Sequence, residues 1–294
     1  MGLAALRSQR VLGLRVLRVN GEPGDYWEVL ARPECRPEVE AAVARELQAR
    51  QRDWDALVIS RLPEGSSTAD AVARAGLRVA HRSATPCPGM TLPESFDAYL
   101  STLPTARRTN LRRRLRNLDN GELELRVPPV ADFPVVIDRW QALRTRQWAA
   151  MGKKLMPEHT KQRFRDFLVD ATTELVPAGL ALVWEFRHND EVVGSFINFC
   201  DGGTFYQFLG AFAPEHGRLA IGKVATAEGI RSSIAAGRTY YDFARGDEDY
   251  KYWYGASDRF SAKVLFTGER ARSVAVGRLG SVGPLGSLFA RVVT

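Results

Sequence analysis

The chain has 294 residues, of which 45% are apolar, and a formal net charge of +7. This length allows one large domain or two smaller ones, each with a full hydrophobic core. No apolar run is long enough to span a membrane, and residues 1–18 lack the unbroken apolar block of a secretory signal. We therefore expect no integral membrane segment.

The cysteines Cys35, Cys87 and Cys200 are odd in number and far apart in the sequence. Neither they nor the four histidines have the spacing of metal ligands, so we expect no disulfide framework and no metal site. A reduced, cytoplasmic location is the simplest interpretation.

Lysine and arginine together number 41, against 34 acidic residues, and arginine supplies most of the positive charge. Two explanations remain open. The arginine content follows from the base composition of the genome, or it serves an anionic ligand such as a coenzyme with phosphates, a nucleic acid or an anionic lipid.

In chain order, the first part alternates short strands with helices. An apolar stretch at residues 14–19 predicts a strand, and Pro37 begins an amphipathic helix. Further strands are expected at residues 55–60 and 77–84, with a short helix at residues 67–76 between them. This order indicates a mixed α/β layer.

Residues 105–118 form a strongly basic predicted helix. Leu111, Leu115 and Leu118 repeat at helical spacing, which indicates one apolar face. The other faces carry Arg107, Arg108, Arg112, Arg113, Arg114 and Arg116.

Pro128 and Pro129 form the best candidate for a domain boundary. After them, the pattern predicts two amphipathic helices, three strands joined by short hairpin turns, a third helix and two more strands. The first two helices are expected at residues 133–151 and 158–175, and the hairpin strands at residues 180–187, 191–200 and 204–210. The third helix is expected at residues 219–236. The last strands, at residues 240–243 and 259–266, are expected to close the sheet.

A glycine-bracketed turn at residues 217–223 leads into the third helix. Gly217 and Gly222 allow the backbone to approach a ligand closely. The helix start offers unpaired N–H groups and the positive end of the helix dipole, which suits a phosphate. The alternative is a plain loop with close helix packing. The spacing is neither that of a P-loop nor that of a dinucleotide-binding glycine motif.

Three blocks of the sequence together resemble the GNAT acyltransferase superfamily, and specifically the CelD/BioF-like domain that is related to the Fem aminoacyl transferases. The blocks are residues 107–126, the turn at residues 217–223, and residues 241–251, which read Tyr-Asp-Phe-Ala-Arg-Gly-Asp-Glu-Asp-Tyr-Lys. The third block is the most specific, and the resemblance covers residues 25–266.

The resemblance implies an α/β fold of mixed α and β layers with two tandem GNAT-like halves, each a mostly antiparallel sheet flanked by helices. Residues 1–127, including the basic helix, are expected to form a degenerate N-terminal half. Residues 128–270 are expected to form the GNAT acyltransferase domain, and residues 271–294 a loosely ordered tail.

The resemblance also implies how acyl-CoA would bind as a co-substrate. In GNAT folds two strands splay apart, and their free backbone groups hold the pantetheine arm, here residues 208–212 against residues 240–243. The pyrophosphate would rest on the glycine-bracketed turn. The cofactor-binding residues expected on this basis are Leu209, Ala211, Gly217, Arg218, Leu219, Ala220, Ile221, Gly222 and Lys223.

Asp242, Tyr250 and Lys251 are the catalytic candidates. Acyl transfer to an amine needs a neutral amine, a polarised carbonyl and a proton for the departing thiolate. Asp242 would orient or deprotonate the amine, or form a salt bridge. Tyr250 would protonate the thiolate, as the resemblance implies, or pack as an ordinary aromatic residue. Lys251 would stabilise the oxyanion or bind an acidic acceptor, or remain solvated.

Arg107, Arg108 and Arg245 are the substrate-binding candidates. The basic helix has several interpretations: a solvated face that packs structurally, or a contact for an anionic acceptor, for RNA or for a membrane surface.

The predicted function is that of a cytoplasmic GNAT-type N-acyltransferase. It would move an acyl group, acetyl in the simplest case, from acetyl-CoA or another acyl-CoA to a small-molecule amine by direct attack. One alternative is a Fem-like transferase that uses aminoacyl-tRNA as its donor. The other is a non-catalytic GNAT scaffold in polysaccharide or envelope biosynthesis.

Overall fold

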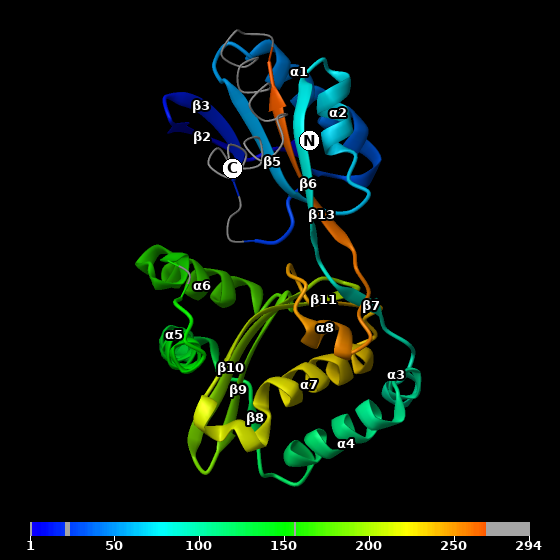
Figure 1. Ribbon diagram of the computed structural model, residues 1–294, viewed down its shortest axis with the longest axis vertical. Coiled ribbons are helices and arrows are strands. Elements are labelled where there is room, and N and C mark those ends of the chain that lie inside the picture. The colour runs from blue at the N-terminus through cyan, green and yellow to red at the C-terminus, as the bar shows by residue number, and fades with distance from the viewer. Residues whose placement is uncertain (1, 21–23, 156, 269–294) are drawn as a thin grey trace. The chain divides into compact units, whose positions relative to one another are not determined.

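The computed structural model describes residues 2–20, 24–155 and 157–268, and it divides the chain into two compact units (Figure 1). The second unit spans Pro88–Ser257. The first contains the part of the chain up to Cys87 and the segment that begins at Asp258. The predicted tail at residues 271–294 lies outside the described residues.

This division differs from the expected boundary between residues 127 and 128. The basic helix belongs to the second unit because its buried leucines, Leu111 and Leu115, pack into the large hydrophobic core of that unit. The short strand that follows the helix pairs with a strand of the same unit. The proline pair therefore marks a turn inside the second unit.

The first unit has a sheet with the strand order β2-β3-β5-β13-β6, in which β3 and β5 are parallel and the other neighbours antiparallel. Its elements are β1 (Gly2–Leu3), β2 (Leu6–Val11), β3 (Leu14–Val19), β4 (Leu30–Ala31), η1 (Pro33–Cys35), α1 (Arg36–Ala49), β5 (Ala56–Leu62), α2 (Thr68–Arg74), β6 (Arg78–Pro86) and β13 (Phe260–Thr267).

The strand predicted at residues 259–266 forms, but in a different sheet from the one expected. As β13 it lies between β5 and β6 of the first unit. Val264 and Phe266 are buried there in the core that also contains Leu47 of α1 and Val72 of α2. Sequence alternation identifies a strand but does not identify its neighbours, because non-local pairing decides them.

The second unit has a sheet with the order β7-β12-β11-β10-β9-β8. Its elements are β7 (Gly89–Thr91), α3 (Phe96–Thr102), α4 (Thr105–Asp119), β8 (Glu124–Arg126), η2 (Val130–Asp132), α5 (Phe133–Ala150), η3 (Pro157–Thr160), α6 (Gln162–Leu175), β9 (Ala181–His188), β10 (Glu191–Cys200), β11 (Thr204–Phe212), η4 (Pro214–Leu219), α7 (Ile221–Ala235), β12 (Tyr240–Asp242) and α8 (Asp249–Trp253).

The predicted hairpins are confirmed, because β9, β10 and β11 pair antiparallel in sequence order. The predicted fold class is also confirmed: mixed α and β layers with mostly antiparallel sheets flanked by helices. Among the described helices, none combines the length and the apolar character needed to cross a bilayer.

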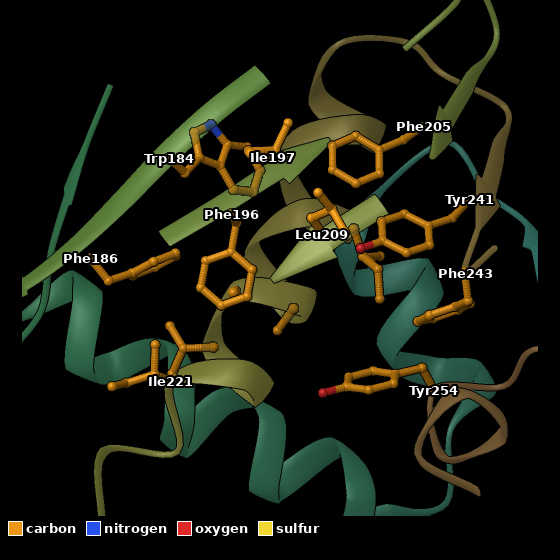
Figure 2. Close-up of a cluster of buried hydrophobic side chains, with 14 of the residues drawn as sticks. Trp184, Phe186, Phe196, Ile197, Phe205, Leu209, Ile221, Tyr241, Phe243 and Tyr254 are labelled. Atoms are coloured by element: carbon orange, nitrogen blue, oxygen red, sulfur yellow. The ribbon is translucent and has the colours of Figure 1, made fainter. Parts of the chain in front are cut away.

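Helices cover both faces of the sheet of the second unit, with α5 and α6 on one face and α4 and α7 on the other (Figure 1). Figure 2 shows the core on the α7 side, where aromatic side chains of the strands meet Ile221 of α7. Phe205 and Tyr241 stack across β11 and β12 with ring centroids 4.9 Å apart. Phe243 continues this row toward Tyr254 at the end of α8. The row fixes β12 and α8 on the sheet.

On the opposite face, the fully buried carboxylate of Glu185 on β9 accepts hydrogen bonds from two arginines. Arg139 comes from α5 and Arg126 from β8, so the carboxylate ties a helix and an edge strand to the sheet. A buried charge is tolerated only when it is paired in this way.

We expect Arg139→Met to lower the free energy of unfolding of the second unit by about 3 kcal/mol, because the buried carboxylate loses its partner on α5. Urea unfolding monitored by circular dichroism would measure the change. Arg146→Met is the matched control on the same helix: Arg146 forms a half-exposed pair with Glu215, and its loss should cost less than about 1 kcal/mol. Equal effects of the two substitutions would contradict the role given to Glu185.

Candidate active site

The parallel strands β11 and β12 pair over only three residues each. Thr204 pairs with Tyr240 at one end and Tyr206 pairs with Asp242 at the other, where β12 stops. β11 continues to Phe212. Within the described chain, no strand pairs with residues 207–212 on the side of β12. This half of β11 therefore has an edge that no strand occupies, at the splay that the resemblance implies, and one carbonyl of this half, that of Gly210, accepts a hydrogen bond from Arg144.

β11 also changes shape at the point where β12 leaves it. Asn198 of β10 pairs with Gln207, whereas the adjacent Ile197 pairs with Leu209, so Phe208 has no counterpart on β10. Such a bulge bends a strand and increases its local twist. The bulge therefore lies directly after the last residue of β11 that pairs with β12.

The turn after β12 is held by Asp242 and Lys251, two of the predicted catalytic residues. A carboxylate oxygen of the buried Asp242 accepts a hydrogen bond from the backbone N–H of Ala244 at 2.6 Å. Ala244 has a positive φ of 59°, a conformation that L-residues rarely adopt unless the surroundings impose it. This contact helps to turn the chain away from β11.

Lys251 is 2% exposed, and its ammonium lies inside this turn. It donates to the backbone carbonyls of Ala244, Arg245 and Gly246 at 2.8–3.0 Å, and Glu248 Oε2 is 2.9 Å away. An ammonium has three protons, and four acceptors surround this one. The contacts of Lys251 are thus those of a structural clamp, and neither a solvated lysine nor a free oxyanion donor describes its position.

The start of α7 offers backbone donors without acceptors. Ala220 has a left-handed φ of 51°, which begins the helix abruptly. Within the described residues, the N–H groups of Ile221 and Gly222 have no hydrogen-bond acceptor. Helix α4 fixes the preceding turn, since Arg114 donates to the carbonyl of Arg218 and Asn117 to that of Leu219. A helix start of this kind favours an anion.

Several predicted cofactor-binding residues can contact a ligand only through their backbone. The side chains of these residues are buried in the core: Leu209, Ala211, Leu219 and Ile221. Gly222 is required by packing, because a Cβ there would lie 2.9 Å from the ring of Phe212. Gly217 and Arg218 are exposed. Lys223 is also exposed, with its ammonium 4.8 Å from the centre of the Trp253 ring.

Tyr250 is joined to the sheet through Gln207, a residue that the sequence did not single out. Gln207 donates to the Tyr250 hydroxyl at 3.5 Å, and its carbonyl oxygen accepts hydrogen bonds from Tyr241 and Thr226. Tyr250 is 46% exposed, and its partial desolvation against the sheet raises its pKa to about 12; the Glu248 carboxylate also raises the pKa, and Arg144 lowers it. The phenol therefore keeps its proton at neutral pH beside the free half of β11.

The predicted substrate-binding arginines do not form one cluster. Arg107 donates to the carbonyls of Tyr252 and Trp253 and so holds the end of α8. Arg108 bonds to Thr105 on its own helix. The side chain of Arg245 is exposed, and its carbonyl accepts from the Lys251 ammonium.

The histidines and cysteines do not gather into a metal site in the part of the chain that the structure describes, where no group of three His, Cys, Asp or Glu side chains could hold an ion. His216, next to the turn before α7, pairs with Glu191. Burial raises the pKa of the Cys200 thiol, which is typical of a core cysteine.

We expect Lys251→Met to lower the free energy of unfolding by about 3 kcal/mol, because three carbonyls of the turn lose their donor in a buried place. Thermal unfolding would show the loss, and limited proteolysis should cut within residues 244–249. Lys154→Met, which changes an exposed lysine of the same unit, is the matched control and should change neither. A Lys251→Met protein with unchanged stability and an intact turn would contradict the clamp.

Comparison with known proteins agrees with this geometry. A family model described as an acetyltransferase (GNAT) domain matches residues 105–252, which is half of the chain. The match begins at the basic helix α4 and ends within α8, so it lies inside the second unit. No curated protein matches the chain.

Solved structures share the fold over most of the chain. FemX has a TM-score of 0.60 at 10% identity and covers 87% of this chain and 88% of its own. L-PGS from Bacillus licheniformis has a TM-score of 0.58 at 13% identity, with 93% and 85% covered. The C-terminal domain of a protein described as a lysylphosphatidylglycerol synthetase from Agrobacterium fabrum has a TM-score of 0.57 at 9% identity, with 93% and 87% covered.

At these identities the similar structures show the fold alone. The family model matches the part of the chain that contains β11, β12 and the turn before α7. The chain belongs to the GNAT acetyltransferase-domain family and is an acyltransferase of that fold.

Proposed function

We propose that the chain transfers an acyl group from acyl-CoA to a small-molecule amine, with acetyl-CoA as the simplest donor. One observation carries the proposal: the unpaired half of β11 leads directly into the turn where Ile221 and Gly222 present N–H groups without acceptors. We place the reaction in the cytoplasm, where acyl-CoA is available, and the proposal gives no role to a metal.

The two parts of this site fit the two parts of the coenzyme. A pantetheine arm carries amide groups that can pair with residues 207–212 as an added strand would. The diphosphate would accept hydrogen bonds from the N–H groups of Ile221 and Gly222, with Arg218 or Lys223 as its charge partner. Gly217, whose Cβ position is open, and Ala220 would shape the turn around it.

In the proposed reaction, the neutral amine attacks the thioester carbonyl, a C–N bond forms and the C–S bond breaks. The departing thiolate takes the proton of the Tyr250 hydroxyl, the amine releases its own proton to solvent, and solvent returns a proton to the Tyr250 phenolate. Asp242 and Lys251 contribute by holding the turn that carries Tyr250, since both are buried and bonded within it.

We expect acetyl-CoA to bind saturably and Arg218→Ala to weaken the binding about tenfold, the effect of losing one charge-assisted contact. Isothermal titration calorimetry would measure both. Arg113→Ala, which removes an exposed arginine of α4, is the control with the same change of charge and should leave the affinity unchanged.

The same titrations separate the alternatives. A Fem-like transferase would instead bind aminoacyl-tRNA with a steep salt dependence that Arg113→Ala reduces. A scaffold without activity would bind neither donor. Either result, obtained with a folded protein, would overturn the proposed donor.

We expect Tyr250→Phe to lower kcat about 100-fold with little change in the KM for acetyl-CoA, because it removes the proton donor but not the coenzyme contacts. Since the raised pKa keeps the phenol protonated, the wild-type rate should show no alkaline decline below about pH 10 that depends on Tyr250. Steady-state thiol release across pH would test this. An alkaline decline between about pH 8 and 10 that disappears in Tyr250→Phe would contradict the assignment.

A further inference from the structure

The inner face of α5 changes character along its length. In its first three turns the residues that face the sheet are apolar, among them Phe133, Val136 and Trp140. The same periodicity then brings Gln147 to this face, and Arg144 lies one turn before it, partly buried. Polar groups in such positions cost free energy unless they are satisfied, so packing alone does not account for them.

Arg144 is only partly satisfied. One terminal nitrogen donates to the carbonyl of Gly210 at 3.0 Å, and the guanidinium lies 4.7 Å from the centre of the Trp148 ring. Its Nε is buried without an acceptor, and the Oε1 of Gln147, whose side chain is more than nine-tenths buried, also has no partner. Within the described ranges, Arg144 forms no ion pair with an acidic side chain.

The nearby acidic side chain is engaged elsewhere. Glu248 interacts electrostatically with Arg144, but its carboxylate contacts the ammonium of Lys251 at 2.9 Å. A guanidinium presents a rigid fork of donors that matches a carboxylate or a phosphate. Arg144 thus has at least one donor without an acceptor, a ring of Trp148 that it stacks against, and no carboxylate of the described residues as an ion-pair partner.

The guanidinium of Arg144 lies near the part of β11 where the proposed reaction would occur. Gly210 lies on the unpaired half of β11, and Arg144 acts on the ionisation of Tyr250. Helix α5 covers the face of the sheet opposite to α7, where the coenzyme phosphates would bind (Figure 1). A group held by Arg144 would therefore approach the reacting carbonyl from the side opposite to the diphosphate.

We propose that Arg144 and Trp148 form an anion subsite for the acceptor, so that the acceptor amine carries a carboxylate or a phosphate. Gln147, one turn further along the inner face of α5, has an unpartnered oxygen that would accept a hydrogen bond from the ammonium or amide of the same molecule. The inference rests on the proposed function, because it assigns one of the two substrates of that reaction.

Matched pairs of small amines test the subsite. Glycine against glycinamide reports on a carboxylate, and O-phosphoethanolamine against ethanolamine reports on a phosphate. Binding would be measured by calorimetry with and without CoA, and transfer by thiol release from acetyl-CoA. We expect the anionic member of at least one pair to be preferred about tenfold or more, the effect of one charged hydrogen-bonded contact.

Substitutions in α5 test whether Arg144 causes the preference for the anionic amine. Arg144→Met should abolish it and Arg144→Lys should retain part of it, while Arg146→Met, two residues further along the same helix, should leave it unchanged. Circular dichroism would confirm that each variant is folded. The comparison of the pairs on the wild-type protein does not depend on any variant.

Three results would overturn the subsite. The first is a wild-type protein that prefers the anionic member of neither pair. The second is a preference that persists in a folded Arg144→Met protein. The third is a preference for succinyl-CoA over acetyl-CoA that Arg144→Met removes, because this result would place the anion on the donor. Loss of coenzyme binding is a separate result, because it opposes the proposed function and is measured without any amine.

Discussion

The lysine-held turn after β12 is the constraint on which the site depends. Two parallel strands would normally continue side by side, and the hydrogen-bonding edge of β11 would then be filled by β12. Instead, the buried Lys251 ammonium gathers three carbonyls and Asp242 holds Ala244, so the chain turns aside after three paired residues. A buried cation with this many main-chain partners makes the turn costly to open. The free edge of β11 is therefore a fixed property of the fold.

Two substrates would then meet at one strand from opposite faces of the sheet. On the α7 side, unpaired N–H groups and exposed cationic side chains suit a diphosphate. On the α5 side, Arg144 presents a partly buried guanidinium without a carboxylate partner. Tyr250 lies beside the free half of β11 through its contact with Gln207. Two arginines of α4 have structural contacts in this unit: Arg107 bonds to the end of α8, and Arg114 bonds to the turn before α7.

The parts of the fold that depend on local sequence could be predicted. Short turns between alternating strands predicted the hairpins of β9, β10 and β11, and the leucine spacing predicted α4. Non-local pairing could not be predicted, so β13 was expected in the wrong sheet and the boundary was set at the prolines.

The site residues also include some that the sequence predicted and some that it did not. Asp242, Tyr250 and Lys251 stood out in a specific segment, but the saturated contacts of Lys251 become visible only once the turn is folded. Arg144 and Gln147 gave a signal that could have been used, namely polar residues at the inward spacing of α5.

The most direct measurement of the central claim is backbone amide hydrogen exchange with and without acetyl-CoA. If the coenzyme pairs with the free edge of β11, amides within residues 207–212 and those of Ile221 and Gly222 should become protected on binding. Amides of residues 204–206, which already belong to paired strands, should change little. Saturable binding that leaves residues 207–212 and the start of α7 unprotected would contradict the account.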